Sequence, residues 1–180
     1  GTDELAEALQ QTSASAQLAG LSLDKTLAYI ATISEVTRQS GATIGQSLKT
    51  VFARINQVKL GKLVDDDTGE DVSRVETVLK EYNLTLRDTE GQFRDTGMVI
   101  DELAMKWVKL TSAEKSEIAE QFAGVRQKDK FLTLMNNYNR ALELEEISLN
   151  SAGSAMNKFN IYQESTQAKM SELKNEFEIF

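Results

Sequence analysis

The stretch 37–58, TRQSGATIGQSLKTVFARINQV, decides the fold. Its large apolar residues recur at helical spacing and therefore fall on one stripe of an α-helix. They are Ile44, Leu48, Val51, Phe52, Ile55 and Val58. The polar residues that fall on the opposite face are Gln46, Lys49, Arg54 and Asn56. The pattern predicts a helix that is half buried and half solvated, whose stripe serves packing or interaction and not chemistry.

The composition favours an all-α protein. The 180 residues contain no proline, and 41% of them are hydrophobic, which is enough for one ordinary domain or two small ones. Without proline, only glycine, asparagine and capping residues can end a helix. We therefore expect mainly a helical bundle, with a small β-hairpin near residues 84–94 and a long C-terminal helix.

The residue types also exclude several classes of function. The chain has no cysteine and no histidine, which removes disulfides, the usual zinc sites, cysteine nucleophiles and histidine-dependent triads. Its net charge of −8 argues against direct binding to a nucleic-acid backbone. No apolar run approaches the roughly 20 residues that cross a bilayer. We expect no enzyme activity, cofactor, metal, direct nucleic-acid partner or membrane contact in this segment.

Four parts are expected along the chain. They are an N-terminal three-helix subdomain at 1–60, an acidic loop at 61–72, a subdomain of a hairpin and short helices at 73–137, and a long, coiled-coil-like helix at 138–180. The chain starts without methionine and ends on the apolar EFEIF, which is typical of a segment cut from a longer protein.

Two helices at 3–19 and 23–39 should precede the central one. Gly20 can end the first as a left-handed cap, and Ser22 can cap the start of the second. Short glycine-containing turns favour antiparallel neighbours. The residues expected to point inward are Leu5, Leu9, Ala16 and, more weakly, Leu18 in the first helix, and Leu27, Ile30, Ile33 and Val36 in the second.

The acidic loop contains two glycines and three consecutive aspartates, and it is a candidate hinge. Ser73 and Glu76 then fit a capping box for a short helix, which Asn83 can end in the left-handed conformation. Residues 84–94 alternate apolar and polar side chains about a glycine-containing turn, which predicts the hairpin. The hairpin residues that must pack on helices, because an isolated hairpin is marginal, are Leu84, Leu86 and Phe93.

Two further helices are expected before residue 138. Asp95 can cap the first, and Thr111 with Glu114 forms a capping box for the second, which Gly124 should end. The residues expected on buried faces of these helices and of the short one after Gly124 are Met98, Leu103, Trp107, Ile118, Ala119, Phe122, Phe131, Leu134 and Met135. Trp107, the only tryptophan, could be an exposed recognition residue, but its helical spacing from Leu103 favours the core.

The C-terminal part should form one or two long helices, interrupted at most near 150–153. An apolar seam runs along it at an average coiled-coil period, which predicts a partner helix in this chain or in another copy. Its members are Phe159, Tyr162, Thr166, Met170, Leu173, Phe177 and Phe180.

Two S-x-x-K patterns could place a lysine beside a serine nucleophile, at Ser22–Lys25 and at Ser171–Lys174. The companion motifs of such enzymes are missing, and Ser22 is already explained as a helix cap. We therefore favour the structural reading of both.

Two acidic clusters can each be interpreted either as a functional site or as ordinary solvated surface. Residues 65–70 resemble the start of a calcium loop, but glycine stands at the fifth position, where aspartate or asparagine is required. Glu143, Glu145 and Glu146 could form an acid/base pair, yet neighbouring glutamates on a helix usually form a solvated face. We therefore interpret the first cluster as a solvated loop and the second as a solvated helix face.

Two further stretches are informative as whole strings. The first is ATISEVTRQSGATIGQSLKTVFARI, residues 31–55. The second covers residues 83–138 and contains LRD, GQFRD, DELAMKW, AGVRQ and FLTLM in that order. Both stretches resemble the core region of tail tape measure proteins of long-tailed bacteriophages and prophages, in which these motifs follow the same order. Residues 60–72 show no such resemblance.

The resemblance implies a scaffold around which tail-tube subunits polymerise and whose length sets tail length. It brings no catalytic residue to this region. The implied partners are tail-tube and tail-assembly chaperone proteins, with self-association through the C-terminal helix as an option, and the implied location is the virion tail, assembled in the bacterial host cytoplasm. Two alternatives stay open: a cytoplasmic helical adaptor or coiled-coil module, and a non-catalytic part of a cell-wall hydrolase.

Overall fold

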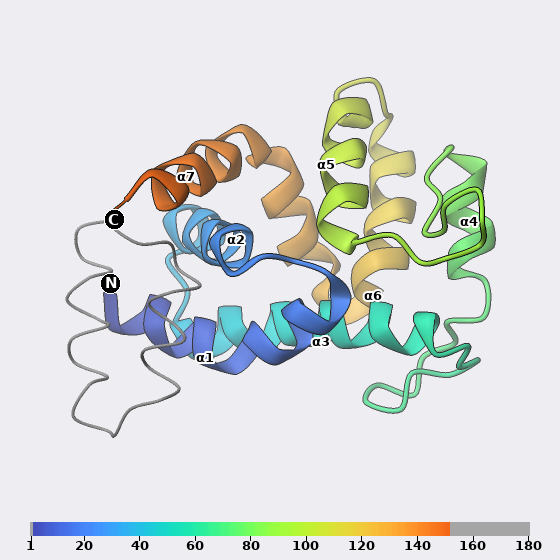
Figure 1. Cartoon of the computed structure of the whole chain (residues 1–180), viewed down its shortest axis with the longest axis horizontal. Helices are drawn as coiled ribbons and strands as arrows, with labels where there is room; N and C mark the ends of the chain where they lie inside the picture. Colours follow the sequence, from blue (N-terminus) through green and yellow to red (C-terminus); the bar gives the residue numbers. More distant parts are fainter. Residues whose placement is uncertain (1, 152–180) are drawn as a thin grey trace.

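The computed structural model describes residues 2–151, which fold into seven helices and contain no β-strand (Figure 1). The all-α prediction is therefore confirmed. The helices are α1 (Thr2–Ala19), α2 (Leu23–Thr37), α3 (Gly41–Lys59), α4 (Val75–Glu81), α5 (Thr96–Trp107), α6 (Ser112–Asn136) and α7 (Tyr138–Asn150).

Most helix ends are set by local signals that the sequence shows. The side chains of Ser22 and Ser40 cap α2 and α3, and Thr111 with Glu114 forms the expected capping box of α6. Gly124 has φ 78° and ψ 172°, so it divides α6 into two helices at the predicted position. The predicted caps at Ser22 and Thr111 and the predicted end at Gly124 are confirmed, because they depend only on neighbouring residues; the cap at Ser40 was not predicted.

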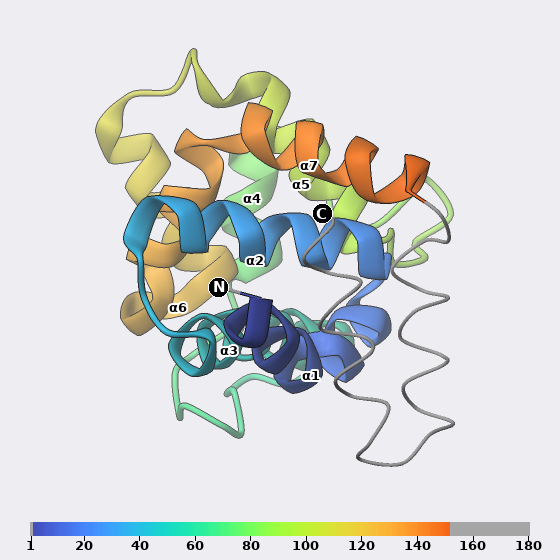
Figure 2. The same ribbon diagram turned by 90° about the vertical axis from the view of Figure 1, so that its left-hand side faces the viewer.

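The first three helices are not arranged as antiparallel neighbours. α1 and α3 lie side by side and run in the same direction, while α2 crosses over both (Figures 1 and 2). A Cβ added to Gly45 on α3 would lie 2.9 Å from the Cα of Ala8 on α1. The absent side chain thus lets the two backbones approach closely, and this contact decides which helices pair.

The molecule has a core that runs through most of the chain. One cluster of buried apolar residues extends from α1 to the start of α7 and includes residues on both sides of the loop 61–72. Phe122 and Phe131, on the two halves of α6, stack in it with ring centroids 5.0 Å apart. The division into subdomains stays a prediction.

The predicted hairpin at 84–94 is reduced to a single antiparallel bridge between Arg87 and Phe93. The Asp88 carboxylate accepts hydrogen bonds from the backbone N–H groups of Glu90 and Gln92, which tightens the turn. Leu84 is buried in the core just before this turn. Two backbone hydrogen bonds, from Asp88 N–H to the Gln92 carbonyl and from Arg94 N–H to the Leu86 carbonyl, close the turn, and they do not extend into a strand ladder among the residues described there.

Several predictions about helix faces and caps are wrong. Leu18, Val36 and Met98, expected inward, are exposed, because each stands at the edge of the buried stripe of its helix. The Ser73 capping box does not form: the Ser73 hydroxyl donates to Asp71 instead, and α4 begins at Val75 without a side-chain cap.

The solvated face predicted for α3 is also wrong in part. Arg54 and Asn56 are buried, because α6 covers one side of α3 and α1 covers the other. Asn56 Nδ2 donates to the carbonyl oxygen of Ser15 on α1. α3 is therefore the central helix of the molecule, with contacts on more than one face.

α7 ends at Asn150, where the sequence predicts an interruption. The seam that begins at Phe159 and includes Leu173 and Phe177 lies outside the described residues.

Candidate functional site

The stripe of α3 lies inside the molecule. Its six residues, from Ile44 to Val58, are each at most 5% exposed and belong to the core cluster shared with α1 and α6. The partner surface that the stripe needs is thus supplied within the chain. The stripe organises the fold and is not accessible to another protein.

Trp107 is also buried, at the end of α5. Its Nε1 donates a hydrogen bond of 2.9 Å to the side-chain oxygen of Asn136, at the end of α6, and the Lys115 ammonium lies 5.4 Å from its ring centroid. Burial with a satisfied N–H is the usual arrangement of a core tryptophan. Its indole thus joins α5 to α6.

Arg54 is a structural residue that the sequence pattern missed. Its Nε donates to the carbonyl oxygen of Gln121 on α6, and its Nη1 lies 2.9 Å from Glu70 Oε1 in the acidic loop. The guanidinium therefore joins α3, the loop and the bend at Gly124. The only feature of the sequence that could have indicated this role is the acidic loop, because its carboxylates favour a nearby cation.

A second polar cluster joins α2, α5 and α7. Lys25 Nζ lies 2.8 Å from Asp101 Oδ1 and 3.0 Å from Glu145 Oε1. The Tyr138 hydroxyl donates to Asp101, and because it has only one proton, it must accept the 2.7 Å hydrogen bond that joins it to Tyr29. Sequence reasoning did not bring these residues together, since they stand far apart in the chain.

The chemistry of this cluster is that of a structural network. Burial raises the pKa of the Tyr29 and Tyr138 hydroxyls well above their ordinary values, so both stay protonated at neutral pH. The Lys25 ammonium is held between the carboxylates of Asp101 and Glu145. The arrangement holds α7 against α2 and α5 and presents no activated nucleophile.

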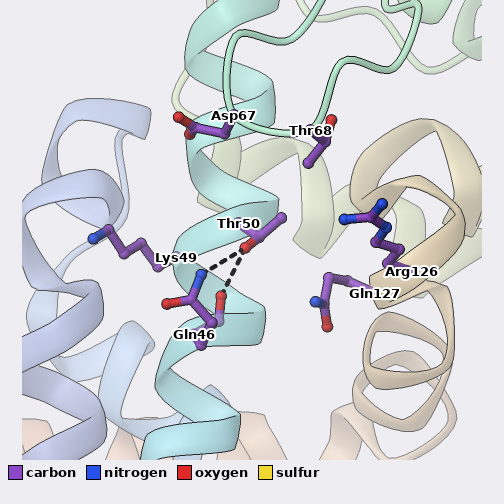
Figure 3. A pocket seen from close by; sticks show the side chains of 7 residues that line it. All are labelled: Gln46, Lys49, Thr50, Asp67, Thr68, Arg126 and Gln127. Carbon is purple, nitrogen blue, oxygen red and sulfur yellow. Dashed lines mark hydrogen bonds between the residues drawn. The ribbon is translucent and has the colours of Figure 1, made fainter.

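Figure 3 shows a polar cavity with a volume of about 350 Å³. Thr50 and Gln46 line it from α3, Thr68 from the acidic loop, and Arg126 and Gln127 from α6. Gln46 and Thr50 hydrogen-bond to each other, while Arg126 has no ion-pair partner among the residues that the structure describes. Such a surface suits polar contacts with a partner.

The serine–lysine pattern in α2 does not form a catalytic pair. Ser22 accepts a hydrogen bond from the backbone N–H of Lys25, as a helix cap does, while the Lys25 ammonium turns to Asp101 and Glu145. The second pattern, at Ser171, lies outside the described residues.

The carboxylates of the acidic loop that the structure buries or pairs are engaged by groups of the protein. Asp65 is buried and accepts hydrogen bonds from the N–H of Asp67 and the hydroxyl of Thr68, and Glu70 pairs with Arg54. Within residues 2–151, no group of three or more acidic side chains is placed to hold a metal ion.

The glutamates of α7 also have separate roles. Glu145 pairs with Lys25, Glu143 pairs with Arg140, and Glu146 is exposed. Across the described helices, none is long and apolar enough to span a membrane.

These features together define a helical structural protein, in which ion pairs and small-residue contacts hold helices in place. Comparison with known families places it more closely. The chain matches the phage-related minor tail protein family over residues 1–124, and it belongs to that family. It is thus a phage tail protein and a component of the virion tail. No solved structure matches the chain significantly.

Proposed function

We propose that the chain is a segment of a tail tape measure protein, which helps to set tail length and scaffolds assembly of the tail tube in the bacterial host cytoplasm. The observation that carries the proposal is the family match over 1–124. That range contains the whole of the first tape-measure-like stretch, 31–55, and most of the second, 83–138. The helical fold with structurally engaged charges supports a scaffold and not an enzyme.

The partners that follow from this role are tail-tube and tail-assembly chaperone proteins. The polar cavity between α3, the acidic loop and α6 offers them a surface with hydroxyl, amide and guanidinium groups (Figure 3). Self-association through the C-terminal seam, with Phe159, Leu173 and Phe177, would join copies along the tail axis.

The test is an in-frame duplication of codons 2–151 in the phage or prophage gene, with tail length measured by electron microscopy. A ruler should lengthen the tail, by up to about 225 Å if about 150 residues are drawn out as helix at 1.5 Å each. An unrelated helical insert of equal length at the same site is the matched control, and it should lengthen the tail equally. Tails of unchanged mean length in viable particles would overturn the proposal.

A further inference from the structure

The polar cavity between α3, the acidic loop and α6 contains hydrogen-bond donors that the described part of the chain does not satisfy (Figure 3). Two cations line it, Lys49 and Arg126, and neither side chain forms an ion pair or a hydrogen bond with any residue between 2 and 151. The same holds for the side-chain amide of Gln127. Because a guanidinium and an ammonium are donors only, what the cavity lacks is an acceptor.

The hydroxyl groups of the cavity are already used as donors. Thr50 Oγ1 donates to the carbonyl oxygen of Gln46, and Thr68 Oγ1 donates to the carboxylate of Asp65. A hydroxyl has only one proton, so neither group can donate to a ligand as well. The donors that remain open are those of the two cations and of Gln127.

The directions of the side chains show which donors face the cavity. Arg126 and Gln127 extend from α6 toward Thr50 on α3 and Thr68 in the loop (Figure 3). Lys49 extends away from them, on the other side of α3. The guanidinium of Arg126 is therefore the charged donor that is presented to the cavity.

The acidic loop does not supply the missing acceptor. Glu70 is paired with Arg54, and Asp66 lies 3.5 Å from the Lys62 ammonium. Asp65 is buried and accepts hydrogen bonds within the loop itself. Asp67 lines the cavity, but its carboxylate extends away from Arg126 (Figure 3). An acceptor other than water would thus have to come from a ligand.

We propose that this cavity binds the carboxylate of an aspartate or glutamate side chain of a partner tail protein, with Arg126 as its anchor. A planar guanidinium pairs with a carboxylate through two parallel N–H···O bonds, and the Gln127 amide adds a further donor. The volume of about 350 Å³ lies at the small end of the range for ligand pockets and suits a side chain. The inference rests on the tail-assembly role proposed above, which supplies a protein partner.

The charges around the cavity favour a single carboxylate over a polyanion. The chain has a net charge of −8, and Asp66 and Asp67 in the loop beside Arg126 would repel a run of phosphates. One carboxylate needs only one cation opposite it, and Arg126 provides that cation. A protein side chain therefore suits this surface better than a nucleic-acid backbone.

NMR titration of the full chain with N-acetyl-glutamate methylamide tests the ligand chemistry. We expect saturable shifts of the Arg126 Nε–H and Gln127 amide signals, with a dissociation constant in the millimolar range because the probe is small and makes few contacts. Arg126→Gln should weaken binding at least about tenfold, which corresponds to about 1.4 kcal/mol. The matched control is Lys109→Gln, at an exposed position after α5 that does not line the cavity, and it should bind the probe like the native chain.

Three outcomes of the titration would overturn the proposal. They are shifts that do not saturate, equal binding of the neutral N-acetyl-glutamine methylamide, and binding of inorganic phosphate without binding of the glutamate probe. Arg126 is exposed, so Arg126→Gln should leave the circular dichroism spectrum unchanged, and weaker binding then reports on the cavity and not on the fold.

Charge reversal in the phage or prophage gene tests the partner. Arg126→Glu should lower the yield of complete tails about tenfold or more, because like charges at the contact oppose binding. Suppressors should replace an aspartate or glutamate of another tail protein with lysine or arginine, and Lys109→Glu is the control. A full yield of tails with Arg126→Glu, or suppressors confined to this chain, would contradict the inference. Tail yield reports on this contact, whereas tail length in the duplication experiment reports on the ruler role, so the two failures are distinguishable.

Discussion

Arg54 shows how one residue can join distant parts of this chain. A buried guanidinium is costly unless its donors are satisfied. Here Glu70 and the carbonyl of Gln121 accept from it, so α3, the acidic loop and the bend of α6 are fixed together. Lys25 does the same for α2, α5 and α7. Both cations join elements that the sequence does not mark as neighbours.

We expect Arg54 and Glu70 to be energetically coupled. In a double-mutant cycle of Arg54→Met and Glu70→Gln, the two single variants should each lose stability, and the double variant should lose less than their sum. Coupling energies of contacting residues lie at about 0.5–3 kcal/mol. Urea unfolding followed by circular dichroism measures it, with Lys62 and Asp66, an exposed pair, as control. Additive losses would show that the pair contributes nothing specific.

Phe52 and Ile55 should be essential to stability. Phe52→Ala removes a fully buried ring, which costs about 3–5 kcal/mol of a total of about 5–15 kcal/mol. Ile55→Asp buries a carboxylate and should abolish a cooperative melt. Lys49→Ala, on the exposed side of α3, should melt like the unsubstituted chain. If Phe52→Ala melted within a few degrees of it as well, the stripe would not be the core.

At the scale of the elements, two kinds of helix contact hold the chain together. α1 and α3 meet through Ala8 and Gly45, where the backbones are too close for a larger side chain. α7 instead packs on α2 through a small cluster of Ala28, Ala31 and Leu144 and through ion pairs. The first contact is apolar and close, and the second is largely polar.

Gly45→Ala should destabilise the protein. In an open helix this change gains about 1 kcal/mol of helix propensity. Here the new methyl group would lie 2.9 Å from Ala8 Cα and 3.1 Å from the carbonyl oxygen of Ala8, and overpacking of this kind costs about 1–3 kcal/mol. Thermal melts should show a lower midpoint, while Gln46→Ala, at the exposed neighbouring position, should change it little. A raised midpoint for Gly45→Ala would disprove the close contact.

The contact between α7 and α2 should weaken in acid. Hydrogen bonds from Arg140 lower the pKa of Glu35 below its usual value of about 4.3. A lowered folded-state pKa means that the pair's stabilisation is fully present above about pH 4.3 and is lost as the pH falls through the folded value. Both side chains are partly exposed, so the effect is small. The melting difference between the native chain and Glu35→Gln should be measurable at pH 7 and shrink as the pH falls below the usual value of about 4.3. A difference that stays constant with pH would refute the linkage.

At the scale of the whole molecule, the described helices cover their own core, which extends from α1 to the start of α7. The central stripe, the aromatic pair of α6 and Trp107 are all enclosed. What the described part of the chain offers to other proteins is therefore its outer surface. A tail protein that assembles with many neighbours needs such surfaces more than it needs a cleft.

The end of the seam should control association. Leu173→Glu with Phe177→Glu should convert any oligomer to a monomer and leave the seven described helices folded, because charge removes the apolar patch that drives association. Light scattering reports the oligomeric state, and circular dichroism reports the fold. A native chain that is already monomeric, with loss of helix throughout the double variant, would show that this end of the seam packs within the chain.

Local sequence signals are enough to find the helices and to explain how several of them begin. The caps at Ser22, Ser40 and Thr111 and the bend at Gly124 follow from hydrogen bonds and backbone preferences within a few residues. The stripe of α3 follows from helical periodicity. Such signals are local, so reading neighbouring residues is enough to find them.

Only the tertiary structure decided which elements meet. Three sets of contacts show this: the parallel pairing of α1 with α3, the ion pair of Arg54 with Glu70, and the cluster around Lys25. They join residues that are 16 to 120 positions apart in the chain. Periodicity placed Arg54 on a solvated face because it cannot tell which second helix will cover that side. The reason is physical: a helix has one local geometry, but several surfaces can bury its sides, and only the packing of the whole chain selects among them.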